Sequence, residues 1–175
     1  MKRLLCGSAL AAILLSPAFA AAPEAVAVLR NTSGAQIGRA DFTQTPHGVN
    51  MVVRAEQLPP GQHAVHIHDV SKCDTADGFK SAGAHFNPAG KEHGRLNPKG
   101  QHAGDMDNQK AGDSGELAVT IVNPNITLEV GANSLFDADG SSLVIHAQPD
   151  DYKSQPAGNA GDRIACGVIE HRLQP

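Results

Sequence analysis

Aromatic and basic residues are scarce in this chain of 175 residues. It has no Trp, one Tyr and five Phe, and its formal net charge is −4. Surfaces that bind nucleic acid or anionic membranes carry an excess of Lys and Arg, and single strands are commonly held by stacking on aromatic rings. The composition therefore argues against nucleic acid and against a membrane surface as partners.

Apolar runs long enough to cross a bilayer, about 20 residues, are also missing. A shorter run, residues 4–15, follows Lys2 and Arg3, and an Ala-Phe-Ala pattern ends at residue 20. These features are typical of a secretory signal peptide over residues 1–20, with a short buried helix as the alternative. We expect a periplasmic or secreted mature domain, residues 21–175, with no membrane attachment and a net charge of −6 once Lys2 and Arg3 are lost.

Cysteine is rare as well. Cys6 lies in the leader, which leaves Cys73 and Cys166 in the mature chain. An oxidising compartment favours disulfides, and two cysteines allow a single pairing. In the chain-entropy account, a bridge closing so long a loop adds about 4–5 kcal/mol to stability. Two buried free thiols are the alternative.

Short β-branched runs, separated by turns rich in Gly, Pro and Asp, fill most of the mature chain. Several alternate apolar with polar residues, and none shows a helical period or an internal repeat. The pattern predicts an all-β domain, an eight-stranded antiparallel Greek-key barrel or sandwich. The predicted strands are residues 26–29, 35–42, 49–55, 64–68, 117–122, 126–130, 143–147 and 164–169.

Two polar segments interrupt this pattern. Residues 69–113 are rich in Gly, Pro, Asp, Asn and His, and residues 148–163 form a second polar stretch. A structureless loop as long as the first is usually either functional or disordered. Because histidines and a cysteine gather there, we expect two long, ordered, functional loops.

Histidine is the enriched chemical group. Nine are present, and His66 and His68 stand two apart on a predicted strand, so both rings share one face and form a two-nitrogen chelate. The long loop adds three imidazoles and one carboxylate, a closed set suited to structural zinc. These four are His85, His93, His102 and Asp105.

Each feature has a plainer explanation when it is taken alone. A single strand histidine such as His146 is more often a hydrogen-bonded core residue, and a His-rich loop can simply be solvated. Their coincidence in one exported β-domain favours a metal site. His47 and His171 fit no such pattern, and we expect both at the surface.

Four motifs together resemble the Cu/Zn superoxide dismutase family, in the family's order and over essentially the whole mature chain. They are residues 61–68 (GQHAVHIH), 81–88 (SAGAHFNP), 101–105 (QHAGD) and 158–169 (GNAGDRIACGVI). The resemblance implies an enzyme that converts superoxide anion to dioxygen and hydrogen peroxide by alternate reduction and oxidation of a bound copper. It implies one copper and one zinc per chain. Copper would be held by His66, His68, His85 and His146, and zinc by His85, His93, His102 and Asp105.

The same resemblance assigns further roles. His85 would bridge the two metals and carry a proton, and Arg163 would attract the anion beside the open copper position. Asp150 would link a copper histidine to a zinc histidine, and His63 would brace the copper strand through backbone contacts. The family's intrachain disulfide matches the pair Cys73 and Cys166.

Some residues depart from the family pattern. Asp69 replaces the commoner Glu after the second copper histidine, and Asp162 directly precedes Arg163. We still expect Arg163 and Lys153 to form a positive funnel above copper, so that the rate falls as salt rises.

Two other functions compete with the enzyme. A non-catalytic copper/zinc-binding protein of the same fold would have no use for Arg163. A zinc hydrolase would need an open zinc position, which Asp105 closes. The sequence does not decide the oligomeric state, and it leaves a homodimer open.

Overall fold

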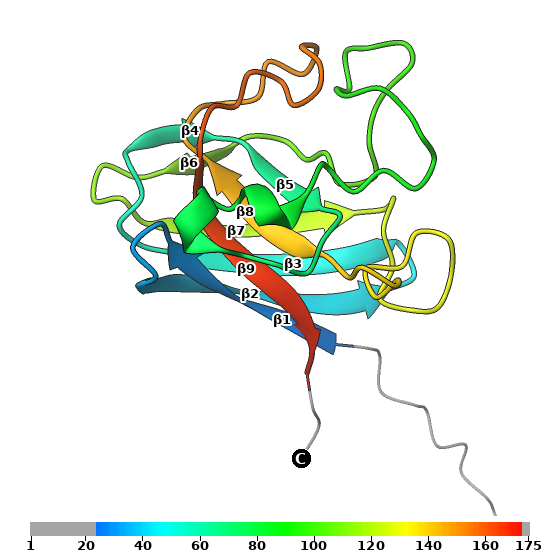
Figure 1. The fold of residues 1–175 in the computed structure, drawn as a ribbon, viewed down its shortest axis with the longest axis horizontal. Helices are drawn as coiled ribbons and strands as arrows, with labels where there is room; N and C mark the ends of the chain where they lie inside the picture. The colour runs from blue at the N-terminus through cyan, green and yellow to red at the C-terminus, as the bar shows by residue number, and fades with distance from the viewer. Residues whose placement is uncertain (1–23, 173–175) are drawn as a thin grey trace, which may run out of the picture.

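The structure, a computed structural model, describes residues 24–172 (Figure 1). The all-β class is confirmed, and the predicted signal peptide lies outside the described residues. No helix among those residues is long and apolar enough to span a membrane. The strands are β1 (Glu24–Asn31), β2 (Gln36–Thr45), β3 (Gly48–Ala55), β4 (Gly61–His63), β5 (Val65–His68), β6 (Gln109–Ala111), β7 (Leu117–Asn123), β8 (Ser142–His146) and β9 (Arg163–His171), with 3₁₀ turns η1 (Thr75–Asp77) and η2 (Lys80–Ala82).

One curled antiparallel sheet forms most of the domain. Its seven strands run in the order β5-β8-β9-β1-β2-β3-β7, and β4 pairs with β6 in a separate two-stranded sheet. Only Ala64 separates β4 from the edge strand β5, and β6 lies beside the other edge strand, β7. The small sheet therefore spans the open side of the curled sheet (Figure 1).

Alternation along the strands builds the core. In β3, Val49, Met51, Val53 and Ala55 are buried while Arg54 is exposed, because successive side chains point to opposite faces. Burial of each large apolar side chain stabilises the fold by about 1.5–3 kcal/mol. The sequence pattern correctly predicts seven of the strands, with shifts at their ends.

The strands β5 and β8 break the alternation, since every residue in them is buried. Their inward side chains, among them Ile67 and Ile145, belong to the main core. The opposite face carries His66, His68 and His146, which are covered by the two long loops. The histidines thus lie between the barrel wall and the loops rather than inside the barrel.

The predicted strand at residues 126–130 is wrong. The segment is a loop whose backbone bonds go elsewhere: the Leu128 amide donates to the Gln44 side chain at 2.8 Å, and the Thr127 amide donates to the Asn133 carbonyl at 2.9 Å. Ile126 and Leu128 are buried in the main core. An apolar loop that packs into the core has the same composition as a strand.

Two short strands are not predicted by the sequence. β6 falls inside the predicted loop 69–113, and β4 precedes the predicted strand 64–68. Each has three residues, too few to show a period. The remainder of both predicted loops is irregular apart from η1 and η2.

The predicted disulfide between Cys73 and Cys166 is present. It fixes the start of the first long loop to β9 and lies beside a small apolar cluster that includes Phe79 and Val144. Because Arg163 starts the same strand, the bridge also ties the loop to the residue expected to attract the anion.

Replacing both cysteines by alanine should lower the free energy of unfolding of the metal-free protein by about 4 kcal/mol, because the bridge restricts the unfolded chain. Guanidinium unfolding curves of the intact, reduced and double-alanine proteins measure this. Reduced protein should resemble the alanine variant. Two free thiols in denatured, unreduced protein would contradict the pairing.

Candidate metal centre

Backbone pairing at the free edge of β5 brings distant ligands together. His68 forms an antiparallel bridge with His85, and His66 forms one with Asp105. On the other side of β5, β8 is in register with it and supplies His146. Segments separated by up to 80 residues in the chain are therefore held at one strand by main-chain hydrogen bonds.

Two groups of possible metal ligands result, and they share one member. Within each group the candidate ligand atoms all lie within 4.8 Å of one another, and every residue is buried. His85 belongs to both groups. The first contains His66, His68, His85 and His146, and the second His85, His93, His102 and Asp105. These are the two sets implied by the resemblance.

In the all-histidine group, hydrogen bonds at one ring nitrogen leave the other one free. His68 Nδ1 donates to the Gly83 carbonyl at 3.1 Å, and His146 Nδ1 lies 3.3 Å from the Gly161 carbonyl. A neutral imidazole has one N–H, so both Nε2 atoms keep a lone pair for a metal. These two Nε2 atoms lie 3.4 Å apart.

His66 and His85 complete this group with nitrogens that have no partner. His66 Nε2 lies 3.0 Å from Asp150 Oδ2, whereas His66 Nδ1 and His85 Nε2 are buried without a hydrogen bond. Buried polar atoms are rarely left unpaired, so such atoms require an explanation. A bound cation would provide one.

In the second group, three rings converge on Asp105. Its Oδ1 lies 2.8 Å from His85 Nδ1 and 3.2 Å from His102 Nδ1, and its Oδ2 lies 3.1 Å from His93 Nδ1. The amides of Gly94 and His102 each donate to Oδ2 at 3.0 Å, which fixes the carboxylate. The donor set of three imidazoles and one carboxylate is that of a closed zinc site.

Burial keeps three imidazoles of the all-histidine group neutral. It lowers the pKa of His146 to about 3 and that of His85 to about 4, and it holds the pKa of His68 well below its usual value. For Asp105, burial opposes ionisation, but hydrogen bonds from three histidines outweigh it and hold the pKa far below its usual range. Neutral imidazole and ionised carboxylate are the forms that bind metals.

Asp150 links the two groups, because its carboxylate contacts one histidine of each. Its Oδ2 lies 3.0 Å from His66 Nε2 and its Oδ1 lies 3.0 Å from His93 Nε2. The Tyr152 amide donates to Oδ1 at 2.6 Å. Gly158 packs against this pair with a φ of 67°, and a Cβ at that position would overlap Asp150 Oδ1. Glycine is therefore required there on both counts.

His63 lies under the site and contacts only backbone through its ring nitrogens. Nδ1 is 2.7 Å from the His146 carbonyl and Nε2 is 2.7 Å from the Pro59 carbonyl. The ring therefore connects β4 to the end of β8, the strand that carries His146.

Arg163 is held beside the all-histidine group by two carbonyls. Nη1 donates to Phe79 at 2.6 Å and Nη2 donates to Gly83 at 2.7 Å. The Gly83 carbonyl is the same one that accepts from His68. Burial lowers the pKa of Arg163, opposed by Asp77 and Asp69, but a guanidinium stays charged at neutral pH.

A cleft of about 510 Å³ leads to His85 and Arg163. Of the two residues expected to form a positive funnel, only Arg163 is among the described residues that line the cleft. The backbone of Lys153 packs against Gly94 of the first long loop. Three carboxylates line the cleft instead, those of Asp69, Asp137 and Asp139.

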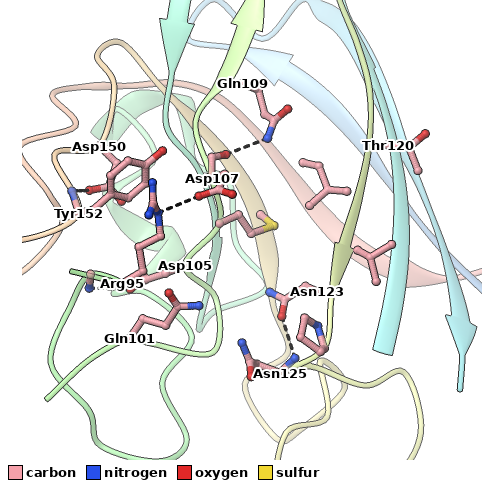
Figure 2. Close-up of a pocket in the computed structure, with 15 residues that line it drawn as sticks. Arg95, Gln101, Asp105, Asp107, Gln109, Thr120, Asn123, Asn125, Asp150 and Tyr152 are labelled. Atoms are coloured by element: carbon pink, nitrogen blue, oxygen red, sulfur yellow. Dashed lines mark hydrogen bonds and ion pairs between the residues drawn. The ribbon is translucent and has the colours of Figure 1, made fainter. Parts of the chain in front are cut away.

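A second cavity of about 350 Å³ reaches the second group, and Asp105 and Asp150 contribute to its wall (Figure 2). Arg95 covers the Tyr152 ring at 4.1 Å, and its Nε pairs with Asp107 at 3.0 Å. Arg95 and Tyr152 belong to no sequence motif, and neither is predicted to contribute to the site. His47 and His171 are exposed, as expected.

Comparison with known proteins identifies relatives over most of the chain. Residues 36–169 match the family described as copper/zinc superoxide dismutase (SODC). Two copper/zinc superoxide dismutases of Aquifex aeolicus are 51% and 50% identical over 93% and 97% of this chain, and the matches cover 96% and 99% of their own lengths. One from Caulobacter vibrioides is 45% identical over 83% of this chain and 85% of its own length.

A solved structure agrees with this assignment. The crystal structure of a superoxide dismutase-like protein from Bacillus subtilis matches with a TM-score of 0.79 at 37% identity, covering 82% of this chain and 96% of that one. With a family match over more than half of the sequence and relatives at half identity along nearly their full length, this chain belongs to the copper/zinc superoxide dismutase family of oxidoreductases.

Proposed function

We propose that the all-histidine group, called the copper-side group below, holds one copper ion per chain, and that the group containing Asp105, the zinc-side group, holds one zinc ion, with His85 shared by both. Superoxide anion is the substrate, and dioxygen and hydrogen peroxide are the products. The observation that carries this proposal is the pair of buried ring nitrogens without partners, His66 Nδ1 and His85 Nε2. Both belong to the all-histidine group, whose ligand atoms face the proposed copper position.

The residues present suit these two ions. Imidazole nitrogen serves copper, and a set closed by a carboxylate suits zinc, which has no redox role. When bound, copper supplies one-electron redox chemistry, and zinc supplies a fixed charge that shapes the site. The protein provides orientation: His66, His68, His93 and His146 are each fixed through their second ring nitrogen, and His85 is fixed by backbone pairing with His68.

His85 is suited to carry the proton that peroxide formation needs. Its Nδ1 is fixed on the Asp105 side at 2.8 Å, so Nε2 is the atom that can take up and return a proton toward the cleft. Arg163 is suited to bind the anion. It has five N–H donors, two carbonyls anchor the side chain, and the remaining donors are free for the substrate.

The alternative is a copper/zinc-binding protein of the same fold without turnover. Metal content and superoxide consumption, measured on the same preparation, separate the two. We expect one copper and one zinc per chain with rapid turnover, which zinc alone does not support. Both metals bound without turnover would contradict the enzyme and favour the binding protein.

We also propose export, with residues 1–20 removed as a signal peptide. The support is the disulfide, which is typical of oxidising compartments, together with the sequence pattern of the leader. Protein purified from the periplasm or medium should begin at Ala21, as intact-mass measurement would show. Retention of Met1 in that protein would contradict the proposal.

Substitution of His85 should lower turnover more than the loss of one metal ligand would. In His85→Ala, three imidazoles still bind copper, but the shared ligand and the proton carrier are lost, so turnover should fall by at least about 100-fold. His93→Ala is the matched control: it should weaken zinc and loosen the loop while leaving measurable turnover. Activity near wild type in copper-loaded His85→Ala would overturn the bridging role.

Asp150→Asn tests the link behind the metals. Loss of a carboxylate that orients metal ligands typically lowers metal affinity 10–100-fold, and we expect this for zinc, with a smaller effect on copper. Chelator competition measures both affinities. Asp107→Asn removes an equal charge from an exposed side chain of the same region and should have little effect. Equal zinc affinities in the two variants would contradict the linking role.

A further inference from the structure

Tyr152 follows Asp150 in the second long loop and contacts two separate stretches of the first. Its amide donates to Asp150 Oδ1 at 2.6 Å, and its hydroxyl accepts the Asn108 amide at 2.9 Å. Its carbonyl accepts the Leu96 amide at 3.2 Å. A Cβ on Gly94 would overlap that carbonyl, so the backbones of the two loops are in direct contact there. Tyr152 therefore joins the two loops at the residue that also fixes the Asp150 carboxylate.

These contacts place Asp150 against His93. Asn108 completes the placement, because its side chain donates to the Asp150 carbonyl at 2.9 Å and accepts the Asp150 amide at 2.7 Å. Asp150 Oδ1 lies 3.0 Å from Nε2 of the buried His93 ring, whose Nδ1 faces Asp105 at 3.1 Å. A ring held in this way stays directed at the zinc-side group after a ligand bond breaks. Rebinding of the ion is then favoured over its release.

Arg95 covers the Tyr152 side chain. Its guanidinium carbon lies 4.1 Å from the centroid of the ring, and its Nε pairs with Asp107 at 3.0 Å (Figure 2). Tyr152 has a φ of 62°, a left-handed conformation that a large residue keeps only where surrounding contacts impose it. Arg95 provides one of these contacts. The Arg95 side chain is half exposed and Asp150 is buried, so the stacked pair lies on the solvent side of the carboxylate.

We propose that Tyr152 is a positioning residue for the zinc-side group and that Arg95, stacked on its ring, slows the release of zinc. The stacked pair of Arg95 and Tyr152 is called the latch below. The inference rests on the proposed function for the identity of the ion, and it concerns retention of the metal rather than turnover. Neither residue belongs to the two ligand groups, so the latch acts through Asp150 and His93.

The expected effect is moderate. Residues that contact a metal ligand change metal affinity about 10–100-fold when they are substituted, and Arg95 is two contacts further from the metal than such a residue. The exposed ion pair with Asp107 contributes little, because solvent screens it. Stacking of a half-exposed cation on the ring is worth more, and its loss in Arg95→Ala should speed zinc release about three- to five-fold.

Zinc release is measured on copper-free protein loaded with zinc alone, by transfer of the ion to an excess of a chromophoric chelator. Arg39→Ala is the matched control, since Arg39 is 46% exposed against 50% for Arg95 and pairs with Asp41 in β2 at 2.7 Å. We expect Arg39→Ala to keep the wild-type rate within about 1.5-fold, because its ion pair is exposed. Arg95→Lys should stay within about two-fold, because an ammonium group can also lie over the ring.

A double-mutant cycle separates the latch from a general loosening of the loop. Tyr152→Phe keeps the ring and loses the acceptor of the Asn108 amide, whereas Tyr152→Leu removes the ring as well. Arg95→Ala should have its full effect beside Tyr152→Phe and almost none beside Tyr152→Leu. An equal effect of Arg95→Ala in both backgrounds would overturn the inference. So would release from the Arg95→Ala single variant at the wild-type rate.

Turnover of the fully loaded wild type decides the proposed function separately. Zinc release that depends on the ring, in a protein that does not consume superoxide, would disprove the enzyme and leave the latch standing. Rapid turnover together with equal release rates in all variants would disprove the latch alone.

Discussion

The arrangement depends on one constraint: an imidazole must stay neutral, dry and in a single orientation to present a lone pair. Each of the four rings of the all-histidine group is oriented by a fixed neighbour. Backbone carbonyls of Gly83 and Gly161 hold two rings, and the carboxylates Asp105 and Asp150 hold the others. Burial lowers the pKa of the His85 and His146 rings and keeps them unprotonated. The acceptors come from the two long loops, so the loops determine the site as much as the strands do.

The loops in turn have little regular structure of their own. The first is attached to β9 by the disulfide and to the edge of β5 by two bridges, and the second is attached through Asp150 to rings on both sides. Metal ions held by the two groups would add ligand bonds at these same points. Loop order and metal binding are therefore linked, because the contacts that fix the loops also fix the metal ligands.

The sequence predicts the strands and the ligand types well, for physical reasons. Period-two alternation marks β3, and the spacing of His66 and His68 fixes their common face. Contacts that depend on tertiary structure cannot be read this way. The apolar loop at residues 126–130 looks like a strand, the role of Gly158 depends on a carboxylate eight residues earlier, and Lys153 turns out to pack on the zinc-side loop. Charge near a site follows from loop paths, so the acidic lining of the cleft has no signature in the sequence.

The position of Arg163 shows how the fold offsets the cost of a strained residue. Phe79, whose carbonyl accepts from Arg163, has a φ of 63°, a left-handed conformation that costs a bulky residue on the order of 1–3 kcal/mol. Its ring is fully buried in the cluster formed with Val144 and Cys166, and burial of a Phe side chain contributes a similar amount. The disulfide holds the loop that carries Phe79 against β9. The direction of the carbonyl, and with it the place of the guanidinium beside His68, is thus set by apolar packing outside the metal centre.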